Sequence, residues 1–266
     1  MKLNKELKIS IVLITIIFLI AIFTPIITPH DAFQMNIKNK LIYPCKEYIL
    51  GTDNRGRDIL SRLILGTRVT LVSSLFVVFI NLMISIPLGI ISGYIGGFFD
   101  TIISRFIEII MAFPQIIISL YLLANWGPGF GNLLFSLILV GWVKYARIIR
   151  GNTKKIKHLD FIKSAKISGS SELDIILKHI LPNIISPVLS IAALDISHVI
   201  LSISALSFIG LGIAPPTPEW GIMLNEAKPF IGSHSYMMWG PGLCILGVVL
   251  SFDLLSRGLK LLISED

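Results

Sequence analysis

Long runs of apolar residues, separated by short polar, glycine-containing or proline-containing segments, dominate this sequence. A helix needs about 20 mainly apolar residues to cross the hydrocarbon core of a bilayer. A transmembrane barrel would instead show alternating apolar and polar positions with a turn about every ten residues, and this pattern is missing here. The chain is therefore predicted to be an all-α polytopic membrane protein with about six spanning helices, at residues 9–27, 70–92, 101–124, 132–149, 184–213 and 240–263.

The first apolar run follows a basic start, so a cleaved signal peptide has to be considered. The run is longer than the hydrophobic region of a signal peptide. Residues 24–30, which follow it, lack the small-x-small pattern of a cleavage site. We interpret the run as an uncleaved anchor.

The basic residues predict how the chain is oriented, because Lys and Arg favour the cytoplasmic side of a membrane. Lys2, Lys5 and Lys8 precede the first span, and a basic stretch lies between Lys144 and Lys178. The bases between residues 38 and 68 fit less well, but the rule is weaker for long loops. We expect both ends of the chain to be cytoplasmic.

Composition supports a membrane protein and excludes several other classes. Hydrophobic residues make up 54% of the chain and charged residues 15%, and the mean hydropathy is +0.81. A soluble domain carries about a quarter of its residues as charged ones. Cys45 and Cys244 are too few for a disulfide framework or a thiolate metal site. The net charge of +7 is explained by orientation, so no nucleic-acid partner is expected.

Residues 150–183 form the only long segment of soluble character on the predicted cytoplasmic side. Asp160 is a plausible N-cap of a short helix, and Gly169 is a plausible stop. Residues 172–182 then read as a second helix ended by Pro182. The segment is either a compact pair of helices below the membrane or an ordinary solvated loop.

The spacing of Ala165-x-x-x-Gly169 followed by Leu181-Pro182 resembles the "EAA" signature of membrane permease subunits of ABC importers. Two positions depart from that signature: Lys163 stands where the Glu is usual, and Ser164 replaces the first Ala. A salt bridge that the Glu would make with a partner ATPase is therefore not expected here.

Three further passages resemble the peptide/nickel branch of these permeases, and in particular its "C"-type subunit. They are LGTDNRGRD at residues 50–58, AFP at 112–114, and LSFIGLG at 206–212 running into PPTPEWG at 215–221. The resemblance extends from the first predicted helix to the last.

The resemblance implies a type I ABC importer permease fold in the bacterial plasma (inner) membrane. Residues 1–69 would form an anchor with an extracytoplasmic segment, and residues 70–266 the permease core. The implied partners are a second homologous permease, two cytoplasmic ATPase subunits, an extracytoplasmic substrate-binding protein and membrane lipid. The segment that would couple to an ATPase contains Lys163, Ser164, Ala165, Gly169, Leu181 and Pro182.

The chain lacks the sequence of a phosphate-binding loop, Gly-x-x-x-x-Gly-Lys-Ser/Thr. Neither a Ser-His-Asp set nor a His-Glu-x-x-His motif is recognisable either. We therefore expect no enzyme activity and no bound cofactor in this chain, with ATP and Mg bound by the partner ATPases.

Ionisable residues within predicted spans are costly and point to functional positions. Arg105 and Glu108, three residues apart, are predicted to pair with each other, and Asp253 is predicted to pair with Arg257. Asp195 and His198 share a helix face, and both side chains are ligands of borderline divalent cations. They form either a structural hydrogen-bonded pair or a transient metal contact on a translocation path.

Met111, Phe113 and Gln115 surround Pro114 and are further candidates for the path, although core packing is the commoner role. From Asp195 and His198 the predicted substrate is nickel or a nickel chelate, and di- or oligopeptides are the alternative. An ATPase-independent secondary transporter or channel is the alternative from another class, but it would give no role to the spacing of Ala165, Gly169, Leu181 and Pro182.

Overall fold

The computed structural model describes residues 4–265, and within them the chain is almost entirely helical. Lys2, which contributed to the predicted orientation, lies outside the described residues. Five helices are long and apolar enough to cross a membrane. They are α1 (Lys5–Ile27), α2 (Ile59–Ile95), α5 (Phe130–Ile156), α8 (Leu181–Phe208) and α10 (Tyr236–Glu265).

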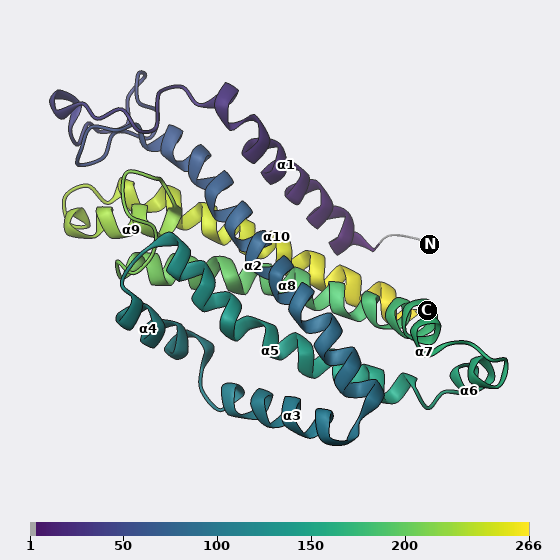
Figure 1. Ribbon diagram of the computed structural model, residues 1–266. Helices are drawn as coiled ribbons and strands as arrows, with labels where there is room; N and C mark the ends of the chain where they lie inside the picture. The colour runs from purple at the N-terminus through teal and green to yellow at the C-terminus, as the bar shows by residue number, and fades with distance from the viewer. Residues whose placement is uncertain (1–3, 266) are drawn as a thin grey trace.

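The predicted straight span at residues 101–124 is wrong, because this part of the chain is a broken pair of helices. α3 (Gly97–Met111) and α4 (Gln115–Trp126) meet at a bend of 82°. Pro114 lacks a backbone N–H and disfavours a helical conformation of the residue before it, which explains the break. Since α2 ends and α5 begins at opposite ends of the bundle, α3 and α4 together return the chain along its length (Figure 1).

The bounds of several helices differ from the apolar runs that predicted them. α2 begins at Ile59 rather than residue 70, since the Asp58 carboxylate accepts a hydrogen bond of 2.9 Å from the Ser61 N–H and caps the helix. α5 continues to Ile156, past the predicted end at residue 149. α8 ends at Phe208 instead of residue 213, because Gly210 turns the chain with φ of +90°.

The bundle is built around the contact of α2 with α5 and the contact of α8 with α10. Leu133, Leu137 and Ile149 of α5 are fully buried in the core. Gly89 of α2 lies directly against Ile149, so that a Cβ atom there would come within 2.7 Å of the Ile149 side chain. Small residues at such contacts allow membrane helices to approach closely, which is the role of Gly89.

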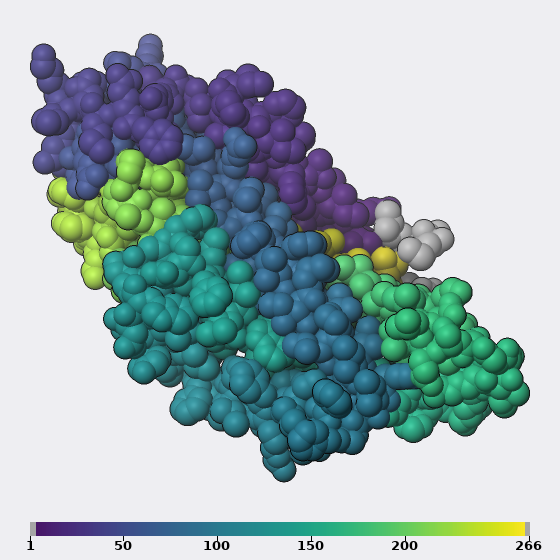
Figure 2. Space-filling model, viewed as in Figure 1, coloured from purple at the N-terminus to yellow at the C-terminus, as the bar shows by residue number. Residues whose placement is uncertain are grey.

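The two ends of the bundle differ in structure. One end carries the start of α1, the end of α10 and the short elements α6 (Asp160–Ile167), α7 (Glu172–Asp174) and η2, a π-helical turn (Ile175–Ile180) (Figure 1). The other end carries residues 28–58, which include the 3₁₀ turn η1 (Ile37–Asn39), and α9 (Trp220–Ala227) with the turn η3 (Lys228–Phe230). In Figure 2 the α6–α7 region projects from the bundle as a separate knob.

Candidate functional site: a projecting segment and four polar clusters

We call residues 157–182 the projecting segment. Ile162 of α6 and Ile175 and Ile180 of η2 are fully buried, so one face of the segment is fixed to the rest of the molecule. Leu159, rather than the predicted Asp160, occupies the N-cap position of α6. Asp160 is the first helical residue and accepts a 2.8 Å hydrogen bond from the Lys163 ammonium, which lowers the pKa of this carboxyl group.

Gly169 ends α6 as predicted. Its φ of +80° lies in the left-handed region, which only glycine adopts without strain. The Gly169 N–H donates to the Lys166 carbonyl at 3.0 Å, and the Ser170 N–H donates to the Ala165 carbonyl at 3.1 Å. These two bonds form a Schellman motif, which satisfies carbonyls at the helix end and fixes the direction in which the chain leaves α6.

The predicted helix end at Pro182 is wrong, because the helix continues through this residue into α8. The π-helical turn η2 comes directly before it, and the Leu181 N–H bonds to the Ile176 carbonyl, five residues back. A proline has no N–H to donate and crowds the carbonyl four residues back. The wider turn accommodates both consequences, so Pro182 marks the joint between the projecting segment and α8 rather than a stop.

The projecting segment exposes several large apolar side chains. Ile167 is 88% exposed and Leu173 70% exposed, with Phe161 and Leu177 also exposed. Contiguous exposed apolar surface on a protein typically marks a contact with another protein. These exposed side chains make the projecting segment a candidate surface for contact with another protein.

Polar contacts connect the projecting segment to the ends of the spanning helices. The Tyr94 hydroxyl of α2 donates a hydrogen bond to Glu172, and Lys166 lies 5.1 Å from the centre of the Tyr94 ring. The hydrogen bond with Tyr94 raises the pKa of Lys166. These contacts join α6 and α7 to the end of α2.

A second cluster, next to the projecting segment, ties α2, α3 and α5 together. The Asp100 carboxylate of α3 accepts hydrogen bonds from Ser92 of α2 at 2.8 Å, and from Lys154 and Arg150 of α5 at 2.6 and 3.0 Å. This ion pairing joins three helices at the end of the bundle that carries the projecting segment.

A third cluster lies near the middle of the bundle, between α5 and α8. Asp195 is 2% exposed, and its carboxylate accepts hydrogen bonds from the Lys144 ammonium and, at 2.7 Å, from the Tyr145 hydroxyl. His198 is 61% exposed, with its Nδ1 atom 3.9 Å from the Asp195 carboxylate. Lys144 is the first charged residue of α5 and follows the mainly apolar residues 130–143 of this helix.

The two predicted pairs of neighbouring charges are confirmed. Arg105 and Glu108 pair at 2.8 Å on the surface of α3, and Asp253 pairs with Arg257 on α10. Asp195, in contrast, pairs with Lys144 instead of forming a hydrogen bond with His198. Within residues 4–265 no group of three or more His, Cys, Asp or Glu side chains is arranged to hold a metal ion.

The three candidate path residues at Pro114 lie at the bend between α3 and α4. Met111 and Phe113 are exposed, and Gln115 is half-buried. The Arg147 guanidinium of α5 lies 3.7 Å from the Met111 sulfur. The bend therefore presents these side chains on the surface of the bundle, and their place on a path stays a prediction.

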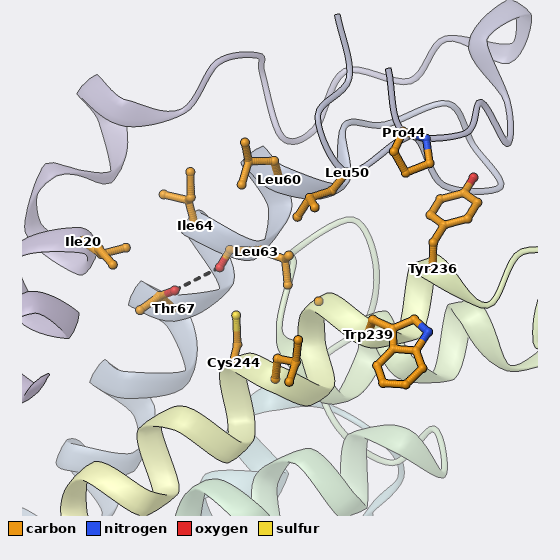
Figure 3. A pocket seen from close by; sticks show the side chains of 12 residues that line it. Ile20, Pro44, Leu50, Leu60, Leu63, Ile64, Thr67, Tyr236, Trp239 and Cys244 are labelled. Carbon is orange, nitrogen blue, oxygen red and sulfur yellow. Dashed lines mark hydrogen bonds between the residues drawn. The ribbon is translucent and has the colours of Figure 1, made fainter. Parts of the chain in front are cut away.

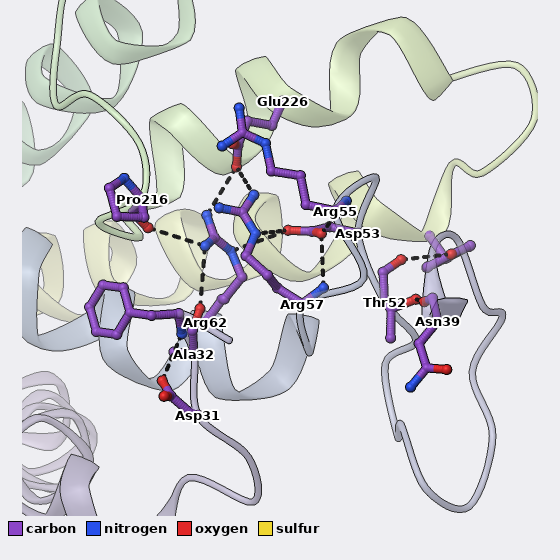
Figure 4. A network of polar contacts seen from close by, with 12 residues as sticks. Asp31, Ala32, Asn39, Thr52, Asp53, Arg55, Arg57, Arg62, Pro216 and Glu226 are labelled. Carbon is purple, nitrogen blue, oxygen red and sulfur yellow. Dashed lines mark hydrogen bonds and ion pairs between the residues drawn. The ribbon is translucent and has the colours of Figure 1, made fainter. Parts of the chain in front are cut away.

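A buried cluster at the other end of the bundle joins residues 28–58 to α9 (Figure 4). Arg57 and Arg62 are almost fully buried, and both donate to the same oxygen of Glu226, at 2.8 and 2.9 Å. Arg57 also donates to Asp53 at 2.6 Å. Asp53 and Glu226 thus neutralise Arg57 and Arg62. These two arginines are among the bases between residues 38 and 68 that fit the predicted orientation less well.

Glu219 is a buried acid of the same end that has a different role. It caps α9 by accepting hydrogen bonds from the N–H groups of Gly221 and Ile222, at 2.8 and 3.0 Å. Burial raises the pKa of this carboxyl group. Asp53, Arg57 and Glu219 all lie in the sequence passages that suggested the family, so those passages build the end of the bundle opposite the projecting segment.

A cavity of about 440 Å³ lies between α1, α2 and α10 (Figure 3). Ile20 and Ile64 line it from α1 and α2, and Trp239 and Cys244 from α10. The lining is almost entirely apolar, so this cavity does not suit a polar or charged substrate.

Comparison with known proteins gives consistent matches. Residues 85–262 match the family described as "Binding-protein-dependent transport system inner membrane component". A dipeptide transport system permease protein of Haemophilus influenzae is 36% identical, over 97% of this chain and 90% of the relative. A glutathione transport system permease protein of Pectobacterium atrosepticum is 36% identical, over 93% of this chain and 82% of the relative.

A nickel transport system permease protein of Escherichia coli (strain K12) is 32% identical, over 96% of this chain and 92% of the relative. Among solved structures, a chain of a methionine ABC transporter in an inward-facing conformation superposes with a TM-score of 0.61. That alignment covers 78% of this chain and 98% of the other, at 17% identity, so it compares the folds alone.

Proposed function

The chain belongs to the family of binding-protein-dependent inner-membrane permeases of peptide and nickel ABC importers, and from this premise we propose that it forms one half of a peptide translocation path. The family works with ATPase subunits and a substrate-binding protein. We propose a second permease, two ATPases and an extracytoplasmic binding protein as the partners of this chain, with ATP and Mg bound by the ATPases.

The observation that carries the proposal is the projecting segment with its exposed apolar side chains. We propose that these side chains dock on a cytoplasmic ATPase, with Lys163, Ser164 and Ala165 in the contact helix α6. Lys163 is already paired with Asp160, so the contact rests on apolar side chains such as Ile167. The rigid turn at Gly169 and the joint at Leu181 and Pro182 then carry motion of the ATPase into α8.

We propose short peptides, rather than nickel, as the substrate. Two observations support this change from the sequence-based prediction. The dipeptide and glutathione permeases match at 36% identity and the nickel permease at 32%. The Asp195 carboxylate, the strongest candidate ligand for a metal, is already occupied by the Lys144 ammonium and the Tyr145 hydroxyl. A cation passing this point would have to displace Lys144.

The docking role is tested by replacing Ile167 with Asp and co-purifying the chain with its partner ATPases. Because Ile167 is 88% exposed, the change leaves the fold intact and places a charge in the apolar contact. We expect the recovered ATPase to fall at least tenfold. Replacement of the exposed Leu139 on α5 with Asn is the matched control, and it should leave recovery of the ATPase unchanged.

Undiminished recovery with Ile167→Asp would contradict docking through the exposed apolar side chains.

The substrate is tested separately, by uptake of a radiolabelled dipeptide and of ⁶³Ni²⁺ into membrane vesicles that contain the assembled importer. ATP-dependent uptake of the dipeptide alone is expected. Uptake of nickel alone would contradict the peptide proposal and return Asp195 and His198 to a role in metal transport.

A further inference from the structure

Lys144 carries its charge near the middle of α5, and its side chain is 29% exposed. It follows the mainly apolar residues 130–143 of this helix, and a charged side chain that borders the apolar part of a span is unfavourable in contact with lipid. Its neighbour His198, near the middle of α8, is 61% exposed. The face of the bundle that carries both side chains is therefore turned toward water or a polar partner rather than toward lipid.

The Asp195 carboxylate lies between the buried side chain of Tyr145 and the face that carries Lys144 and His198. Tyr145 is 1% exposed and donates its hydroxyl to Oδ2 of Asp195 at 2.7 Å from the interior. The Lys144 ammonium donates to Oδ1, and His198 Nδ1 lies 3.9 Å from the same atom. The interior thus fixes the carboxylate, while a cation and an imidazole converge on its accessible side.

Lys144 has unused capacity to bind a further group. An ammonium has three N–H donors, and the bond to Asp195 uses one of them. The long side chain is partly exposed, so its remaining donors are within reach of a molecule on this face of the bundle. The remaining donors suit an acceptor such as a carboxylate, whereas a cation would be repelled by the ammonium.

We infer that Lys144 is a specificity-determining residue that contacts the carboxylate of a peptide as it crosses the membrane, with His198 as a second contact. The inference rests on the proposed function and deepens it. Asp195 and Tyr145 are positioning residues that hold the ammonium in place. Because Asp195 competes with the substrate for the same ammonium, the contact is weak enough to release the peptide.

The test compares two variants of the complete importer that differ only in the ammonium. Asp195→Asn removes the competing carboxylate and keeps Lys144, whereas Lys144→Met with Asp195→Asn removes both charges and leaves no unbalanced one. Both are measured for ATP-driven uptake of a dipeptide with a free carboxyl terminus. We expect the double variant to transport this peptide at least tenfold more slowly than Asp195→Asn, with equal recovery of the complex.

The same dipeptide amidated at its carboxyl terminus supplies the specificity readout. Whatever its absolute rate of uptake, the two variants should transport it equally, since it has no carboxylate for Lys144 to contact. Equal uptake of the free acid by both variants would overturn the inference. Should the methionine side chain prevent assembly, Lys144→Gln with Asp195→Asn gives the same comparison with a polar side chain.

A reversal of the two charges separates recognition from a structural tie between α5 and α8. Lys144→Asp with Asp195→Lys restores an ion pair but moves the ammonium to the other helix. Wild-type uptake by this variant would show that only the pair matters and would overturn the inference. The wild-type complex tests the proposed function separately from the inference. Uptake of the free dipeptide by this complex supports the function, and no uptake would refute it.

Discussion

At the scale of single residues, Glu226 decides how the end of the bundle that carries residues 28–58 is held together. One of its oxygens accepts hydrogen bonds from both Arg57 and Arg62, whose side chains are 0% and 1% exposed. Asp53 shares the first of these cations. Buried charges of this kind are tolerated only because each is paired, and the loss of one partner leaves the others uncompensated.

Glu226→Ala should therefore destabilise the protein strongly. Breaking a buried ion pair by removing one partner costs about 3–5 kcal/mol, and here one removal affects two guanidinium groups. The change should lower the thermal unfolding temperature of the purified protein in detergent. Glu47→Ala is the matched control, since Glu47 is exposed in the same segment. Equal unfolding temperatures for the two variants would contradict the structural role of Glu226.

The residue scale also shows which pairs a sequence can reveal. Arg105–Glu108 and Asp253–Arg257 were predictable because helical spacing alone places their side chains together. Lys144 and Asp195 are 51 positions apart on different helices, so no local spacing predicts their contact. The pairing depends on how α5 and α8 pack against each other, which the local pattern of neither segment contains.

At the scale of elements, two prolines show where sequence patterns are reliable and where they are not. Pro114 divides a predicted span into α3 and α4, bent by 82°. Pro182 was expected to end a helix, yet the helix continues, since the π-helical turn before it removes the clash. Both residues carry the same local restriction on the backbone. Whether the helix breaks or continues at such a proline depends on the packing of the neighbouring helices. That packing cannot be read from a single sequence.

The turn after α6 was predictable from Gly169 and allows a direct test of coupling. Gly169→Ala places a Cβ atom at a φ of +80°, which costs about 1–2 kcal/mol and favours a different exit from α6. No neighbouring atom lies within 4 Å of that Cβ position, so the effect is one of backbone conformation. We expect the amount of peptide transported per ATP hydrolysed to fall several-fold in the reconstituted complex.

Gly151→Ala is the control for this change. Gly151 lies within α5 with no neighbouring atom within 4 Å of its Cβ position, and Ala is favoured over Gly in a helix by about 1 kcal/mol. Its transport per ATP should equal that of the wild type. If Gly169→Ala also matches the wild type, the turn does not transmit motion to α8.

At the scale of the whole molecule, the bundle has two chemically distinct ends. The start of α1, the end of α10 and the projecting segment lie together, and residues 28–58 lie with α9 at the opposite end (Figure 1). The apolar runs and the basic residues predicted this grouping. They could not predict the buried cluster of Arg57, Arg62 and Glu226, which needs residues 164 and 169 positions apart to meet.

The predicted orientation of the ends is testable with the native cysteines. Cys45 is exposed in residues 28–58. With Cys244 replaced by Ser, a membrane-impermeant maleimide added to intact cells should label Cys45 from outside. Ile167→Cys, in a chain with both native cysteines replaced by Ser, should react only after the cells are permeabilised. Labelling of position 167 in intact cells would reverse the orientation.

The central claim is that this chain moves peptides only as part of an ATP-driven assembly. The most direct measurement is accumulation of a radiolabelled dipeptide in proteoliposomes that contain this chain, the second permease and the two ATPases, with the binding protein outside and ATP inside. We predict uptake against the concentration gradient that stops when ATP or the ATPases are omitted. Uptake by the chain alone, or uptake independent of ATP, would contradict the account.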